Sequence, residues 1–125
     1  MELTTNQKGY SSELETGAKL LRQGYNISFP YAPCDYDLIA EKDNIFYKIQ
    51  CKYTTSTKPR KFLTYRVALP YNYSEIDFFM VITPSGFWFI PGQYGLGKNE
   101  ISLTVNPRSK FSKYRDNFEA LKLLS

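Results

Sequence analysis

The chain has 125 residues, of which 42% are hydrophobic and 22% charged, and these values are typical of one globular domain, so we expect residues 1–125 to form a single domain. It contains no histidine, which excludes catalysis by a histidine base. Two cysteines without histidine cannot form a four-ligand zinc site, and a net charge of +4 permits a polyanionic partner. Any bound metal must therefore have oxygen ligands, as Mg²⁺, Mn²⁺ and Ca²⁺ prefer.

A helix is predicted near the N-terminus. Apolar residues recur there at helical spacing, at Leu14, Ala18 and Leu21. This pattern indicates an amphipathic helix over residues 8–23 with the three side chains in the core, and Gly24 is a typical residue just beyond a helix end. Ser12 and Glu15 form a capping-box pattern, so the helix could start at Ser12 instead.

Strands are predicted after this helix because β-prone runs are bounded by turn residues. They span residues 25–29, 36–41, 45–53, 63–69, 78–82 and 87–90. Asp43-Asn44 joins the second and third strands as a hairpin, residues 83–86 join the last two, and residues 92–97 form a loop. A final helix is predicted by helical spacing of Tyr114, Phe118, Leu121 and Leu124. This order predicts an α/β or α+β fold with one mixed sheet.

The strand over residues 45–53 has one apolar and one polar face, because successive side chains of a strand alternate. The core face holds Ile45, Tyr47, Ile49, Cys51 and Tyr53. The other face holds Phe46, Lys48, Gln50 and Lys52. Gln50 and Lys52 therefore point the same way, about 7 Å apart along the strand.

Asp37 lies near the start of the partner strand, so hairpin pairing can bring its carboxylate beside Gln50 and Lys52. A carboxylate, an amide oxygen and a strand carbonyl can hold a hard cation. The lysine can orient or deprotonate a water molecule, or neutralise phosphate charge. The alternative is that Gln50 and Lys52 only form an exposed strand face.

At this point the sequence resembles a known family. Residues 33–37 (PCDYD) and 50–52 (QCK) are similar to the motif of the PD-(D/E)XK nuclease superfamily, with glutamine at the position that usually holds Asp or Glu. The wider spacing resembles that of the intron-encoded (group I intron) homing endonucleases of this superfamily. The segments that carry this resemblance are residues 8–13, 20–25, 36–39, 47–52, 76–79, 88–91 and 114–115.

The resemblance implies an α/β fold with a restriction-endonuclease-like core, in which a central mixed β-sheet is flanked by helices. It implies four catalytic residues, Glu13, Asp37, Gln50 and Lys52. The cofactor would be Mg²⁺ (or Mn²⁺), bound by Asp37, Gln50, Glu13 and the backbone carbonyl of Cys51. Asp35 is the alternative to Asp37 as the metal-binding aspartate, and Glu13 could instead only complement the helix dipole.

The implied activity is that of a site-specific, divalent-metal-dependent DNA endonuclease of the homing type, which hydrolyses phosphodiesters in both strands of a long duplex target. Gln50 lowers the negative charge of the site by one, so we expect weaker metal binding. One site per chain and two strands to cut favour a homo-oligomer, a dimer or a tetramer. The alternatives are a Holliday-junction resolvase or restriction-type nuclease of the same superfamily, and a catalytically inactive DNA-binding module.

Basic residues gather in two stretches of the chain. No acidic residue lies between Asp43 and Glu75, and a second basic cluster lies near the C-terminus. Basic stretches interleaved with aromatic residues suit a surface that follows phosphates, although they could also be solvated loops. The expected contacts to double-stranded DNA are Lys58, Arg60, Lys61, Arg66, Arg108 and Lys110. Arg66 is the residue expected to reach a base edge.

The sequence also predicts where the protein resides. No apolar run approaches the roughly 18 residues that span a bilayer, and the first residues lack the basic and apolar regions of a secretion signal. We therefore expect a protein of the cytoplasm, an organelle or the bacterial interior, with no membrane partner. Cys34 and Cys51 are expected to be reduced thiols.

Overall fold

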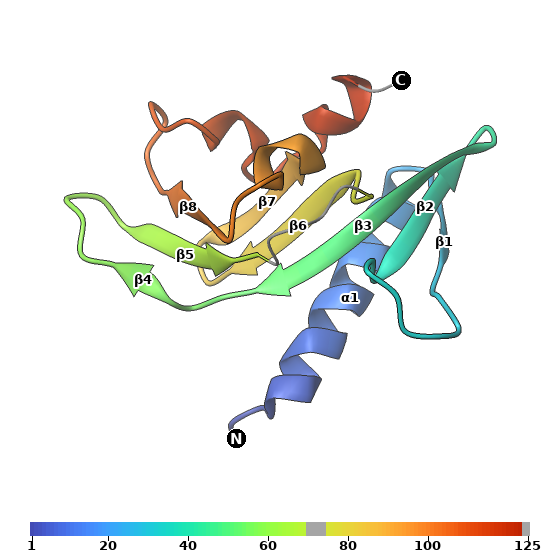
Figure 1. Ribbon diagram of the computed structural model, residues 1–125, viewed down its shortest axis with the longest axis horizontal. Coiled ribbons are helices and arrows are strands. Elements are labelled where there is room, and N and C mark those ends of the chain that lie inside the picture. The colour runs from blue at the N-terminus through green and yellow to red at the C-terminus, as the bar shows by residue number, and fades with distance from the viewer. Residues whose placement is uncertain (70–74, 124–125) are drawn as a thin grey trace.

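The computed structural model describes residues 1–69 and 75–123, which form one α-helix, strands and short 3₁₀ helices (Figure 1). In chain order these are α1 (Thr5–Arg22), β1 (Asn26–Ser28), β2 (Leu38–Lys42), β3 (Ile45–Tyr53), β4 (Thr57–Lys58), β5 (Thr64–Ala68), β6 (Phe78–Thr83), β7 (Gly86–Pro91), η1 (Gly92–Gly95), β8 (Glu100–Thr104), η2 (Ser112–Tyr114) and η3 (Glu119–Leu123). The predicted strands are all found, with shifted ends at several of them.

The larger sheet has five strands in the order β1-β2-β3-β6-β7 (Figure 1). Strands β3 and β6 are parallel and the other neighbours are antiparallel, so the sheet is mixed, as predicted. The turn between β2 and β3 contains Asp43 and Asn44 with positive φ values of 53° and 64°. Such values at both central residues are typical of a two-residue hairpin turn, so the predicted hairpin is confirmed.

A second sheet of three strands, in the order β4-β5-β8, was not predicted. It covers the face of the larger sheet opposite α1. Its inner side packs Tyr65 against Trp88 of β7, with ring centroids 6.2 Å apart, and the Tyr65 hydroxyl bonds to that of Ser85 at 2.6 Å. On the other side of β7, Phe118 packs on Phe87 and Phe89, so both faces of β7 are covered, and every residue of the neighbouring β6 is buried.

Helix α1 covers one face of the larger sheet, where it contacts β1, β2 and β3. Its buried residues are Ser12, Thr16, Gly17 and Leu20. The predicted apolar face was wrong, because Leu14 and Leu21 are 64% and 56% exposed. Small residues face the sheet here, and a Cβ at Gly17 would lie 3.5 Å from Ile27, at ordinary van der Waals distance.

The helix also starts earlier than predicted. Thr4 is the N-cap and forms a capping box with Gln7. The predicted Ser12–Glu15 box was wrong, since Ser12 lies inside the helix and its hydroxyl donates to the Lys8 carbonyl at 2.9 Å. The added turns project beyond the sheet (Figure 1), since residues 5–11 are all exposed.

The predicted C-terminal helix was wrong, because η2 and η3 occupy this part of the described chain. Asp116 adopts a positive φ of 55° and interrupts the helical path. Its backbone N–H donates to the Phe87 carbonyl at 2.7 Å, and its carboxylate accepts the Phe87 N–H at 2.9 Å. Phe118 still packs on Phe87 and Phe89, and the predicted anchor Leu124 lies outside the described residues. Within residues 1–69 and 75–123, one α-helix flanks the sheet where several were predicted.

Two smaller observations complete the fold. Cys34 and Cys51 are both free thiols, as expected. Over residues 1–69 and 75–123, no helix combines the length and hydropathy required to cross a membrane.

Candidate active site

Asp37 is held against strand β3 by two hydrogen bonds. Its backbone N–H donates to the Ile49 carbonyl at 2.9 Å, and its carboxylate Oδ2 accepts the Cys51 N–H at 2.7 Å. The register pairs Leu38 with Ile49, so Asp37 lies opposite Gln50. The hairpin therefore brings the aspartate to the strand segment predicted from the sequence.

Lys52 and Gln50 lie on the same face of β3, and both side chains are half-buried. Burial lowers the pKa of Lys52, and the nearby negative charge of Asp37 partly opposes this effect. A lowered pKa increases the fraction of neutral amine near pH 7, which is the form that can accept a proton. Lys52 is therefore electrostatically coupled to Asp37.

Glu13 reaches the same region from helix α1. Its side chain is half-buried, and its pKa is raised by this burial and by the negative charge of Asp37. Burial also raises the pKa of Asp37, although the hydrogen bond from the Cys51 N–H and the charge of Lys52 lower it. Both carboxylates are thus less stable as anions here than in water, so a cation between them would relieve this cost.

The Cys51 thiol points toward α1, where it is hydrogen-bonded to Thr16, and it is not a reactive group. Burial raises the pKa of the Cys51 thiol to about 12, opposed by a hydrogen bond with Thr16 and reinforced by the charges of Asp37 and Glu13. Because the thiolate is the reactive form of cysteine, the side chain is inert at neutral pH. Its backbone carbonyl is the group that could contribute to a metal site.

The donor set suits a hard cation. Among residues 1–69 and 75–123, no three His, Cys, Asp or Glu side chains cluster so as to hold a metal ion. Two carboxylates are present instead, Glu13 and Asp37, and the Gln50 amide and the Cys51 carbonyl add two oxygen donors. Oxygen donors of this kind fit Mg²⁺ or Mn²⁺.

Two other acidic residues near this region do not join it. Asp35 is exposed in the loop before β2, and Glu15 is exposed on α1. The Asp37 carboxylate is the one that accepts a hydrogen bond from β3, through the Cys51 N–H. Of the two aspartates considered from the sequence, the geometry favours Asp37.

A hollow of about 300 Å³ extends from Lys52 toward strand β5. It is lined by Lys52, Tyr53, Thr54, Ser56, Arg66, Val67 and Ala68. The Thr54 hydroxyl donates to the Arg66 carbonyl at 2.9 Å, and the Arg66 N–H donates to the Ser56 carbonyl at 2.8 Å. These bonds fix β5 beside the end of β3, so Lys52 and Arg66 border one depression.

The outer face of the three-stranded sheet is polar and carries two predicted DNA contacts. Lys58 and Arg66 both form ion pairs with the carboxylate of Glu100, at 3.3 Å for Arg66 Nε. Lys58 also donates to the Ser102 hydroxyl at 2.7 Å. The hydrogen bond and charge of Lys58, together with Arg66, lower the pKa of Glu100. Lys58, one of the expected DNA contacts, is thus engaged with Glu100 and Ser102 within the protein.

The remaining predicted DNA contacts are exposed. Arg60 and Lys61 lie between β4 and β5, and Arg108 and Lys110 follow β8. Lys110 Nζ lies 5.5 Å from the centroid of the Tyr94 ring. A second depression of about 300 Å³ links Lys110 to Glu100 and Ser102, so Lys110 borders the same outer face as Lys58 and Arg66.

Sequence reasoning missed Glu100 and Ser102, because strand β8 was not predicted. The signal was present: residues 100–104 read EISLT, with polar and apolar residues alternating. The register pairs Arg66 with Ser102 and Ala68 with Glu100. These two residues therefore belong to the polar outer face.

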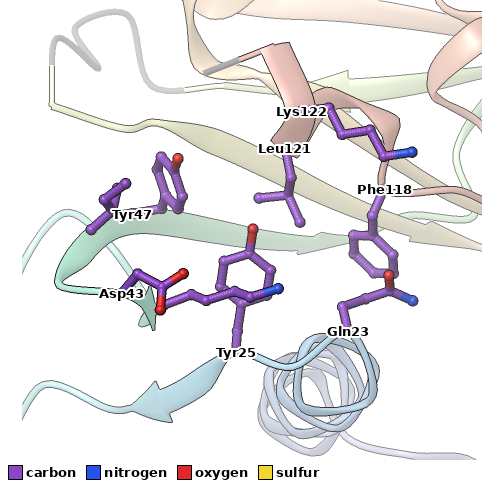
Figure 2. A pocket seen from close by; sticks show the side chains of 9 residues that line it. Gln23, Tyr25, Asp43, Tyr47, Phe118, Leu121 and Lys122 are labelled. Atoms are coloured by element: carbon purple, nitrogen blue, oxygen red, sulfur yellow. The ribbon is translucent and has the colours of Figure 1, made fainter. Parts of the chain in front are cut away.

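Another hollow, of about 320 Å³, lies at the opposite end of β3 (Figure 2). It is lined by Gln23, Tyr25, Lys42, Asp43, Ile45, Tyr47, Phe118, Leu121 and Lys122. Figure 2 shows Tyr25 and Phe118 facing this space from different parts of the chain. None of the predicted catalytic residues lines it.

Comparison with known proteins identifies the family to which the chain belongs. The family model for PD-(D/E)XK endonucleases matches residues 3–115, and the chain therefore belongs to the PD-(D/E)XK endonuclease family. Members of this family generally use divalent metal ions. No curated protein matches the chain significantly.

Two solved structures share the fold. The bacterial homing endonuclease I-Ssp6803I is 21% identical, with a TM-score of 0.78 over 98% of this chain and 92% of that chain. Hjc, a Holliday junction resolvase from the archaeal hyperthermophile Archaeoglobus fulgidus, is 15% identical, with a TM-score of 0.52 over 78% of this chain and 84% of that chain. The predicted α/β nuclease core with a central mixed sheet is therefore confirmed.

Proposed function

We propose that this nuclease is a site-specific, divalent-metal-dependent DNA endonuclease of the homing type, which cuts both strands of a long duplex. One observation carries the proposal: the Asp37 carboxylate is fixed on β3 by the Cys51 N–H at 2.7 Å, beside Lys52. Glu13 lies within electrostatic reach from α1. This combination of acid, oxygen donors and lysine is what phosphodiester hydrolysis requires.

Each residue of the candidate site has a chemical role in this proposal. Asp37, Glu13, the Gln50 amide and the Cys51 carbonyl would hold Mg²⁺ (or Mn²⁺), which supplies positive charge against the phosphate oxygens. Lys52 takes a proton from the attacking water or, when protonated, stabilises the developing charge. The water oxygen bonds to phosphorus as the bond to the leaving sugar oxygen breaks, so no covalent enzyme intermediate forms.

The DNA path is proposed to run from Lys52 over the outer face of the three-stranded sheet. The hollow that Lys52 shares with Arg66 supports this path. Arg60 and Lys61 would contact phosphates, and Lys110 and Arg108 would extend the track. A strand pair fits into the major groove of duplex DNA, so Arg66 is the residue proposed to contact a base edge.

The homing type is favoured over the resolvase type by the extent of the structural similarity. The alignment with the homing endonuclease has a TM-score of 0.78 and covers 98% of this chain, against 0.52 and 78% for the resolvase. Encoding within an intron and action as a homo-oligomer, a dimer or tetramer, are parts of this proposal. Cutting two strands with one site per chain requires more than one copy.

Cleavage of a randomised duplex library in Mg²⁺ tests the proposed function. Wild-type protein should enrich DNA ends at one long sequence, and Asp37→Asn should give none. Cleavage of four-way junctions without sequence preference would support the resolvase reading instead. Salt-sensitive binding without cleavage of either substrate would support an inactive DNA-binding module.

A further inference from the structure

Four polar side chains on the outer face of the three-stranded sheet form one connected network. Lys58 Nζ donates to the Ser102 hydroxyl at 2.7 Å and forms an ion pair with one carboxylate oxygen of Glu100. The other carboxylate oxygen of Glu100 forms an ion pair with Arg66 Nε at 3.3 Å. The four residues come from all three strands, β4, β5 and β8, so the network links the strands across this face.

The exposure of the side chains increases along this network. The Lys58 side chain is 15% exposed, that of Glu100 is 37% exposed, and that of Arg66 is 48% exposed. Lys58 is therefore an internal anchor, and Arg66 is the outermost cation of the network. The hydrogen bond with Lys58 and the charges of Lys58 and Arg66 lower the pKa of Glu100, so Glu100 is a carboxylate at neutral pH.

A carboxylate at this place does not suit a surface that only follows phosphates. Glu100 repels phosphate oxygens and neutralises one of the two positive charges beside it. It suits the orientation of an arginine instead. Contact at Nε uses one side of the guanidinium group of Arg66 and leaves the two Nη groups as a pair of donors. In the major groove, guanine presents the acceptors O6 and N7, which such a pair of donors binds.

We propose that Glu100 is a positioning residue that orients Arg66 toward a guanine of the DNA target, with Lys58 and Ser102 as the anchor of Glu100. The inference rests on the proposed function and adds to it the base that is recognised and the residues that orient the arginine. Lys58 thereby acts within the protein instead of contacting a phosphate. A guanidinium group held in one direction loses less side-chain entropy on binding, so the guanine contact gains affinity.

The arginine lies close to the candidate active site. Arg66 and Lys52 border the same hollow of about 300 Å³. Successive phosphates of one strand are about 3.4 Å apart along the duplex axis, so a hollow of this size spans about two or three base pairs. Because the arginine side chain extends this reach, the guanine should lie within about four base pairs of the cut phosphate.

Selection of bound duplexes from a randomised library, with the cleavage-deficient Asp37→Asn protein, tests the inference. The selected sequences should have guanine at a fixed position within about four base pairs of the wild-type cut. Arg66→Lys keeps the charge but not the paired donors, and it should reduce this guanine preference about 5- to 150-fold. Lys61→Met is the matched control at an exposed residue between β4 and β5, and it should weaken binding to all sequences equally.

The positioning role of Glu100 has a test of its own in the same selection. Glu100→Gln and Lys58→Met should each reduce the guanine preference at that position and at no other, and Lys58→Arg should retain it. In the Arg66→Lys protein, Glu100→Gln should change the guanine preference no further, because the two residues act through one contact. A merely structural role would weaken binding at every position, and circular dichroism shows whether each variant is folded.

The possible failures are distinguishable. A guanine preference that persists in Arg66→Lys or in Glu100→Gln would overturn the inference and leave the proposed function in place. Selected sequences with no guanine in the expected range would do the same. Random sequences among the duplexes bound by the Asp37→Asn protein would overturn the proposed site specificity itself, and the inference with it.

Discussion

The Asp37 carboxylate accepts the backbone N–H of Cys51 at 2.7 Å, so the aspartate is fixed to the strand that carries Gln50 and Lys52. This bond holds the carboxylate without using a side chain of β3. The side chains of Gln50 and Lys52 are therefore left for a phosphate, a water molecule or a cation.

Asp37→Asn should abolish cleavage and stabilise the protein when metal is absent. Burial disfavours the charged form of Asp37, and asparagine keeps an oxygen that accepts the Cys51 N–H while removing the charge. We expect a higher melting temperature than wild type in EDTA, and no further rise on addition of Mg²⁺, which should stabilise wild type.

Asp35→Asn is the matched control for this change. Asp35 is exposed two residues before Asp37, so the control should cleave DNA and melt like wild type in both conditions. A loss of cleavage in Asp35→Asn with activity retained in Asp37→Asn would exchange the roles of the two aspartates.

Lys52→Met should reduce the single-turnover cleavage rate about 10²–10⁴-fold, the usual contribution of a positioned acid or base. DNA affinity should change little, because one of many basic residues is lost. Lys48→Met is the matched control, since Lys48 lies on the same face of β3 but pairs with Glu75 at 3.6 Å. Equal losses in the two variants would indicate that general positive charge, and not the position of Lys52, supports cleavage.

The hairpin of β2 and β3 could be predicted from sequence because two local signals agree. Side chains alternate along residues 45–53, and Asp43-Asn44 tolerates the positive φ that the turn requires. Asp37 and Lys52 follow from this hairpin, since antiparallel register sets which residues face each other.

Other parts of the fold depend on contacts between distant segments, which no local pattern reports. The α1 face was mis-assigned because Thr16 and Gly17 are buried against the sheet, while apolar Leu14 remains exposed. The predicted C-terminal helix is interrupted at Asp116, which is hydrogen-bonded to Phe87, 29 residues away along the chain. The ion pair of Glu100 with Arg66 could not be predicted without knowing that β8 pairs with β5.

Leu20→Ala and Leu21→Ala form a direct test of which face of α1 is buried. Leu20 is 0% exposed, so its truncation should lower the free energy of unfolding by about 2–5 kcal/mol. Leu21 is 56% exposed, and its truncation should change this free energy by no more than about 0.5 kcal/mol at low protein concentration. Urea unfolding measures both. A larger loss of unfolding free energy in Leu21→Ala than in Leu20→Ala would mean that the face of α1 predicted from the sequence is the buried one.

Gln50→Glu should lower the Mg²⁺ concentration needed for half-maximal cleavage, by roughly tenfold, because an added carboxylate strengthens a hard-cation site. Gln93→Glu, at an exposed residue of η1, adds the same charge elsewhere and should leave the metal requirement unchanged. A Mg²⁺ titration of cleavage compares the three proteins. An unchanged requirement in Gln50→Glu would remove Gln50 from the proposed metal site.

Glu100→Gln should strengthen binding to non-specific DNA and reduce discrimination between sequences. Glu100 forms ion pairs with Lys58 and Arg66, so its loss frees two cations for phosphates. Each new phosphate contact should steepen the dependence of log affinity on log salt by about 0.9. Binding is measured in the cleavage-deficient Asp37→Asn background over a salt series.

The control for Glu100→Gln is Glu75→Gln, which removes the same charge and breaks the pair with Lys48. If Glu100 restrains the DNA-facing cations, its variant should show the steeper salt dependence and the control should not. Equal slopes would mean that net charge alone raises the affinity. In that case the ion pair with Glu100 would not limit how Arg66 binds DNA. Discrimination between DNA sequences should then be the same in both variants.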